Sequence, residues 1–123
     1  MSIIYTTAVK NTRLDAVVTA IGGTGVLEIG TAGMASILAT ISLNATAGTT
    51  SGGVLTFSGF PKSDTSADAT GTAAAARILT ATAGTDIITG LTVGLSGSDV
   101  NLDNLSIAAG QTVTINSAAI THA

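Results

Sequence analysis

Apolar and polar residues alternate in short runs through the last third of the chain. Between Asp86 and Ile120 apolar side chains recur at every second position, and turns of small residues at 97–98 and 108–110 separate the runs. Alternation with a period of two marks a strand with one buried face. Several such runs at short spacing are typical of an antiparallel sandwich or barrel. The sequence therefore predicts a mainly β fold.

One stretch near the start of the chain has the spacing of a helix instead. Its apolar residues recur at positions that share one helix face, namely Leu14, Val17, Val18 and Ile21. Thr6 or Thr7 is a suitable N-cap, and Gly22 with Gly23 ends the segment because glycine readily adopts the left-handed conformation. We expect an amphipathic helix at about 7–21, which either covers an open side of the sheets or docks on a partner.

The same reading places further strands before the last third, at 26–29, 34–43, 54–58 and 75–82, with a return strand at 86–89. Residues 44–53 are small and polar, so a loop is expected there. The turn at 108–111 is expected to join the last two strands as a hairpin. We expect a single domain over residues 1–123, with the β-sandwich or barrel at about 25–121.

The segment from Pro61 to Ala76 contains no large apolar side chain. Such a stretch buries little area, and loops beyond ~12–15 residues are uncommon unless they are functional or disordered. Two interpretations of a long polar loop at about 60–76 stay open. It is either a solvated loop leading into a strand from about residue 73, or an extended arm that orders on a neighbouring subunit.

Charge is scarce along the whole chain. Only 9% of residues are charged and the net charge is −3, whereas soluble domains average about 25% charged residues. An uncharged surface rich in Thr, Ala, Ser and Gly suits a protein that is packed against partners. The cations form no cluster, which argues against nucleic-acid binding; they are Lys10, Arg13, Lys62 and Arg77.

The chain has no cysteine, so the sequence offers neither disulfides nor thiolate metal ligands. It shows no apolar run near the ~20 residues of a membrane-spanning helix. The first residues lack a basic segment followed by a long apolar run, so no secretory signal is expected. We expect synthesis in the cytoplasm and no membrane partner.

One motif resembles the start of a calcium-binding loop. Asp99, Asn101 and Asp103 place oxygen-bearing side chains two residues apart. The sixth position of that motif is Asn104 rather than glycine, and the twelfth is Gly110 rather than glutamate. The favoured interpretation is a strand that turns these three side chains to solvent and the residues between them to the core.

No arrangement predicts catalysis. Asp64 and Asp68 lie in the polar segment, where such residues usually make local turns and where nothing apolar would raise a carboxyl pKa. His122 is the only histidine and stands next to the last residue, where an oriented general base is not expected. We expect no enzyme activity, no cofactor and no bound metal, and a small hydrolase is the least favoured alternative.

Three stretches resemble a family of small structural proteins encoded among the head genes of tailed bacteriophages. They are VLEIGTAGMASILATI at 26–41, SDTSADATGTAAAARILTATAGTDIITG at 63–90 and GSDVNLDNLSIAAGQTVTINSAAITHA at 97–123. The resemblance implies a β-rich head decoration (cement) protein or another minor component of the virion, and it brings no catalytic residues. An acidic balance fits the outer face of a capsid better than its DNA-facing side.

Together these observations favour a decoration protein that is made in the host cytoplasm, binds the major capsid protein and remains on the capsid surface of the virion. A homotrimer is expected, because local threefold points join capsomers and closed symmetry is usual for homo-oligomers. The alternative is a tail- or fibre-associated adhesion module. The expected interface is the helix face, the first residues and the 60–76 segment, with these candidates: Ile3, Tyr5, Lys10, Arg13, Phe60, Pro61, Lys62, Asp64 and Asp68.

Overall fold

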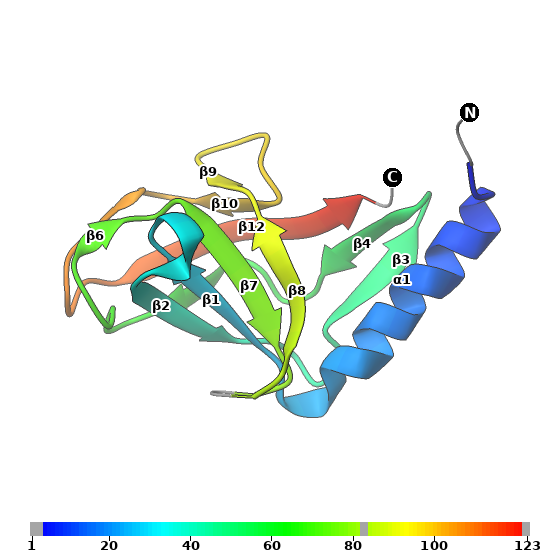
Figure 1. Cartoon of the computed structure of the whole chain (residues 1–123), viewed down its shortest axis with the longest axis horizontal. Coiled ribbons are helices and arrows are strands. Elements are labelled where there is room, and N and C mark those ends of the chain that lie inside the picture. Colours follow the sequence, from blue (N-terminus) through cyan, green and yellow to red (C-terminus); the bar gives the residue numbers. More distant parts are fainter. Residues whose placement is uncertain (1–3, 82–83, 122–123) are drawn as a thin grey trace.

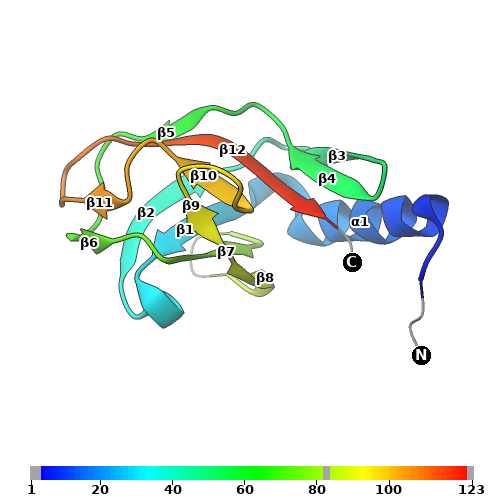
Figure 2. The ribbon, with the colours of Figure 1, turned by 90° about the horizontal axis from the view of Figure 1, so that it is seen from above.

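Two β-sheets lie in separate layers on either side of an apolar core, and one helix runs along the end of the molecule (Figures 1 and 2). The computed structural model describes residues 4–81 and 84–121. The fold is mainly β and consistent with a sandwich, as the alternation predicted. The sheets do not close into a barrel, so the barrel alternative is wrong.

The first sheet has four antiparallel strands in the order β2-β1-β7-β8. Its strands are β1 (Val26–Gly30), β2 (Ile37–Ser42), β7 (Ala75–Leu79) and β8 (Asp86–Leu91). Every residue of β1 is buried, since the strand is central and flanked by β2 and β7. β1 thus fixes one wall of the core.

The second sheet is built around the long strand β12 (Val113–Thr121). Its order is β3-β4-β12-β10-β9, and β5 also pairs with β12. The remaining strands are β3 (Gly48–Ser51), β4 (Val54–Phe57), β5 (Lys62–Asp64), β9 (Val93–Gly94) and β10 (Val100–Leu102). A separate two-stranded pair joins β6 (Gly71–Thr72) to β11 (Ser106–Ile107).

The predicted helix is present as α1 (Thr7–Ile21). The Thr6 hydroxyl accepts a hydrogen bond from the Val9 amide, and Gly22 ends the helix with a φ of 74°. Leu14 and Ile21 are buried, and α1 contacts β3, β4 and β8. Two short 3₁₀ turns, Gly22–Thr24 and Ala32–Met34, complete the helical elements of the described chain.

A buried ion pair crosses the centre of the first sheet. Glu28 of β1 is only 7% exposed, and its Oε1 lies 2.7 Å from Nε of Arg77 on the neighbouring strand β7. The hydrogen bond from the guanidinium to Glu28 raises the pKa of Arg77 above its usual value. The guanidinium therefore stays charged throughout the range in which proteins are handled.

Several predicted boundaries are wrong because backbone pairing, rather than apolar content, decides them. Gly48 to Ser51 form strand β3 inside the predicted 44–53 loop, since β4 supplies hydrogen-bond partners. β2 begins at Ile37 instead of residue 34, because Gly33 and Met34 both take positive φ values and turn the chain.

The order of strands near the end of the chain also differs from a simple meander. The turn at 108–111 joins no hairpin, since β11 pairs with β6 while β12 pairs with β4, β5 and β10. β9 and β10 pair in parallel rather than antiparallel. The pairings of β11 and β12 join residues far apart in sequence, and local alternation specifies neither such partners nor the parallel direction of β9 and β10.

The 60–76 segment is not a long polar loop but part of the sandwich. It contains β5 and β6, and Ala67 and Ala73 are buried. The amides of Ala67 and Ala73 donate to carbonyl oxygens of Gln111 and Leu105. Because alanine fills narrow space and the backbone pairs with distant strands, the segment is held without a large side chain. This corrects both the solvated-loop and the extended-arm interpretations.

Candidate interaction surfaces

The described interface candidates fall into two groups on different parts of the molecule. One group follows β5 and the other surrounds the start of α1, and Figure 2 shows these two elements well apart. Ile3 lies outside the described residues, as does His122. The single interface expected from the sequence therefore becomes two separate surfaces.

The first group, which we call the β5 rim, is Lys62, Asp64 and Asp68. The carboxylate of Asp64 accepts hydrogen bonds from the amides of Thr40 and Ser66, each at 3.0 Å. The hydroxyl of Thr40 donates to the carboxylate of Asp68 at 3.3 Å. These bonds tie the β5 rim to the outer edge of β2, so both acidic side chains help to hold the two sheets together.

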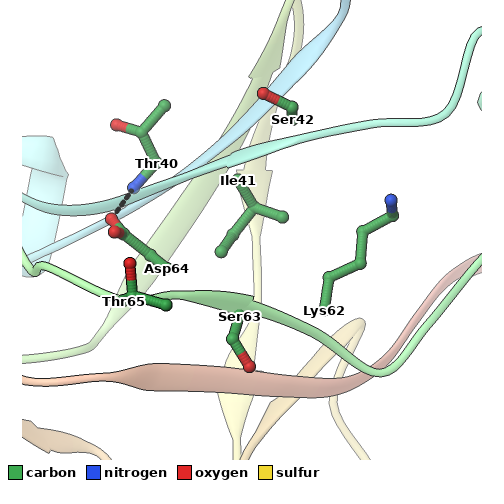
Figure 3. A pocket seen from close by; sticks show the side chains of 7 residues that line it. All are labelled: Thr40, Ile41, Ser42, Lys62, Ser63, Asp64 and Thr65. Atoms are coloured by element: carbon green, nitrogen blue, oxygen red, sulfur yellow. Dashed lines mark hydrogen bonds between the residues drawn. The ribbon is translucent and has the colours of Figure 1, made fainter.

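A small open pocket of about 320 Å³ lies between β2 and β5 (Figure 3). It is lined by Thr40, Ile41, Ser42, Lys62, Ser63, Asp64 and Thr65. Figure 3 shows Asp64 reaching across to Thr40 at one side and Lys62 extending at the other. The ammonium of Lys62 donates to the side-chain oxygen of Asn44 at 2.7 Å.

The chemistry that this pocket offers is hydrogen bonding. Both oxygens of Asp64 accept backbone amides, and the hydroxyl of Ser63 lies 2.9 Å from that of Thr114. The ionic groups are thus engaged in holding strands together. The arrangement gives no paired acid and base directed at a shared point.

Phe60 and Pro61 precede the β5 rim and differ in burial. Phe60 is half-buried and packs against the core, whereas Pro61 is exposed. The peptide bond between them is cis. Phe60 therefore anchors the start of the segment to the core, and Pro61 is the member of the pair that faces solvent.

The second group surrounds the start of α1. The guanidinium carbon of Arg13 lies 4.4 Å from the centre of the Tyr5 ring, a cation–π geometry. The stem of Lys10 lies beside the β3–β4 turn, where a Cβ at Gly53 would be 3.2 Å from its Cδ. The guanidinium of Arg13 and the stem of Lys10 thus both lie along the protein surface.

Large apolar side chains are exposed beside these residues, and of this set the sequence analysis singled out only Tyr5. Ile4 is 81% exposed, Val9 43% and Tyr5 41%, while Leu95 at 60% lies in the turn before β10. A signal for Val9 was present, because it falls on the side of the helix opposite Leu14. Three of the four large apolar side chains exposed in the described chain therefore lie between residues 4 and 9.

The motif that resembles a calcium loop has a structural role. Val100 and Leu102 are buried, as the strand interpretation predicted. The three polar side chains each accept a different backbone amide, Asp99 from Thr92, Asn101 from Ser98 and Asp103 from Thr114. Their oxygens thus brace turns and strands one by one instead of converging.

Residues 4–81 and 84–121 contain no group of three or more His, Cys, Asp or Glu side chains placed to hold a metal ion. Within the same residues no helix has both the length and the apolar character to cross a membrane.

No protein-family model, no curated protein and no solved structure matches this chain.

Proposed function

We propose that this protein is a non-enzymatic structural component of a tailed-phage virion, which binds the outer surface of the capsid and stabilises it as a decoration (cement) protein. The observation that carries the proposal is the cluster of exposed apolar side chains at the start of α1, in a chain of which only 9% of the residues are charged. Exposed apolar patches of this kind are typical of sites that bind other proteins.

The use of the charged side chains supports a structural role. Asp64, Asp99 and Asp103 each accept backbone amides, and Glu28 and Arg77 pair inside the first sheet. Ionic groups that brace the fold in this way contribute to a rigid protein. A net charge of −3 favours the outer shell, since an acidic protein is repelled by packaged nucleic acid.

The stretches that resemble phage head proteins coincide with most of the sandwich. They contain all or nearly all of β1 and β2, then of β5 to β8, and finally of β10 to β12, whereas α1, the β3–β4 hairpin and the short β9 lie outside them. We propose that the sheets are the shared scaffold. The projecting α1, β3 and β4 then form the part that is particular to this chain.

The proposed partners are the major capsid protein and further copies of this chain, with three copies expected at a local threefold point. Many copies bound to one shell act together, so each contact can be weak. The β5 rim with the exposed Pro61 is the proposed second contact with the capsid, and the virion surface is the proposed location.

A thermal assay of phage heads tests the stabilising role. Undecorated heads of a tailed phage that encodes this chain are heated with and without the purified protein, and DNA release is followed with an intercalating dye. The proposal predicts release at a higher temperature with the protein, but not with an unrelated acidic protein of similar mass. An unchanged release temperature at saturating protein would contradict it, and binding to tails or host cells instead would favour the adhesion module.

A further inference from the structure

The start of α1 brings exposed apolar side chains and cations together at one site, which we call the α1 tip. It consists of Ile4, Tyr5, Val9, Lys10 and Arg13. The first three are among the four large apolar side chains exposed in residues 4–81 and 84–121. The last two are half of the four cations of the sequence. Figures 1 and 2 show the start of α1 at one extremity of the molecule, away from the four-stranded sheet.

The two cations of the α1 tip are neighbours on the helix. Lys10 and Arg13 are three residues apart, a spacing that places side chains next to each other, so their like charges repel. The first turn of α1 contains no acidic residue, and among the described residues no carboxylate forms an ion pair with either cation. The α1 tip therefore carries positive charge without a partner, in a chain whose net charge is −3.

The acidic residues of α1 and of the strands packed against it are engaged elsewhere. Asp15 is the one acidic residue of α1, and its carboxylate accepts a hydrogen bond from the hydroxyl of Thr50 at 2.8 Å. The strands β3 and β4 contain no charged residue. β8 also contacts α1, and the carboxylate of its Asp86 lies 3.9 Å from Nη1 of Arg77. These elements thus supply no acidic partner to the α1 tip.

Arg13 is arranged to bind a carboxylate. Its guanidinium carbon lies over the Tyr5 ring, 4.4 Å from the ring centre, so the ring restrains the guanidinium. The N–H groups along the edge of a guanidinium form a fork that matches the two oxygens of a carboxylate. Arg and Tyr are also enriched among the residues that dominate the affinity of protein interfaces.

Ile4 and Val9 determine what must surround such a carboxylate. They are 81% and 43% exposed, and apolar residues of a partner that cover them would remove both from water. Excluding water also strengthens the attraction between opposite charges. An anionic membrane is the less suitable partner, because attachment to a membrane takes a longer basic and apolar segment than the α1 tip provides.

We propose that the α1 tip binds an acidic site on another protein, where a carboxylate of the partner receives the guanidinium of Arg13 and apolar residues around it contact Ile4 and Val9. The inference rests on the proposed function, which makes this partner the major capsid protein, and it adds the chemistry of the capsid site. Such a contact is small, so the many copies on one shell supply the overall strength.

Co-sedimentation of the full chain with undecorated heads, at increasing protein concentration, tests the role of Arg13. We expect Arg13→Gln to raise the concentration of half-saturation by about tenfold. Arg13→Lys should raise it less, because the charge remains but the planar fork is lost. Circular dichroism checks that each variant is folded, which is expected because Arg13 is exposed.

A matched control separates the position of the charge from the net charge. Thr89 is exposed on β8, so Thr89→Lys combined with Arg13→Gln restores the net charge away from the α1 tip. The binding of this double variant to heads should stay as weak as that of Arg13→Gln alone.

Carbodiimide coupling, which joins an amine to a carboxylate in contact with it, identifies the group on the partner. Lys10 of the wild type should become linked to an acidic residue of the capsid protein, as detected by mass spectrometry after digestion. Lys10→Arg keeps the charge but removes the amine, so this variant should bind the heads and form no link at this position.

The outcomes separate this inference from the assignment to the capsid. Saturable binding that is unaffected by Arg13→Gln, recovery of binding by Thr89→Lys, or heads that never become linked to Lys10 would overturn the inference and leave the assignment standing. Equally tight binding to vesicles of phosphatidylserine and phosphatidylcholine would assign the α1 tip to a lipid surface and also overturn it. No binding of the wild type to heads would overturn the proposed function and the inference with it.

Discussion

Removing the guanidinium of Arg77 should destabilise the fold strongly, because it leaves a buried carboxylate without its partner. The side chain of Glu28 is 9% exposed, and its Oε1 is 2.7 Å from Nε of Arg77. Breaking a buried pair by removing one partner costs roughly 3–5 kcal/mol. The side chain of Arg77 is 29% exposed, so water reaches the pair, and we expect Arg77→Met to lower the free energy of unfolding by about 2–3 kcal/mol.

Urea unfolding followed by circular dichroism measures this loss. The slope of the unfolding free energy against urea concentration should not change if the variant alters stability alone. The double variant Glu28→Gln with Arg77→Met should recover part of the loss, since no buried charge is then left unpaired. Arg13→Met is the control for removing an exposed cation and should cost less than about 1 kcal/mol. A loss below about 0.5 kcal/mol in Arg77→Met, or a double variant no more stable than the single one, would refute the reasoning.

The same pair gives a pH prediction. The pKa of Arg77 is higher in the folded protein than in the unfolded chain. The contribution of Arg77 to stability is therefore complete below the pKa of the unfolded chain, and it is lost only as pH rises through the pKa of the folded protein. Because that value is far above neutrality, the difference in stability between wild type and Arg77→Met should stay constant between about pH 7 and 10. A difference that shrinks steadily across this range in urea titrations would show that Arg77 does not remain charged.

Three further outcomes are expected. Ile115→Ala, at a fully buried position of β12, should lower the free energy of unfolding by about 2–5 kcal/mol in the same urea assay; a loss under about 1 kcal/mol would contradict its place in the core. Gly48→Ala should lower the free energy of unfolding by about 1–3 kcal/mol, because an added methyl group would clash with the carbonyl oxygen of Thr56. Gly23→Ala is the control and should be nearly neutral, since the nearest atom to an added Cβ is 3.9 Å away. Equal melting temperatures of the two variants would argue against this packing. Asp64→Ala removes the acceptor of two backbone amides and should speed cleavage within 60–76 by a broad protease, whereas the wild-type segment should resist; equal cleavage rates would show that the carboxylate does not hold it.

The parts of the fold that could be predicted are those whose signal is local. The spacing of Leu14 and Ile21 predicted α1 with its bounds, and alternation predicted that Val100 and Leu102 face the core. Strands without large apolar side chains gave no such signal. β5 exists because the distant strand β12 supplies its hydrogen bonds, so the small polar residues of the 60–76 segment were misread as a loop. β3 is equally poor in apolar residues and exists because the adjoining strand β4 pairs with it.

The candidate surfaces likewise combine features with a local sequence signal and features that depend on distant contacts. The sequence predicted Lys62, Asp64 and Asp68 as interface residues. It could not predict that Thr40 binds both carboxylates, because Thr40 is more than twenty positions away and meets them only through the packing of β2 beside β5. The exposure of Val9 could have been read from the helical spacing. That of Leu95 could not, since it depends on the turn between two strands that pair in parallel.

The measurement that tests the central claim most directly is co-sedimentation of the purified chain with undecorated heads of a phage that encodes it. The account predicts saturable binding with a fixed number of copies per head, set by the symmetry of the capsid, and weaker binding for Val9→Glu than for Leu95→Glu. No binding to heads at concentrations where the protein is folded, or binding that rises without saturation and ignores both variants, would contradict the assignment to the capsid surface.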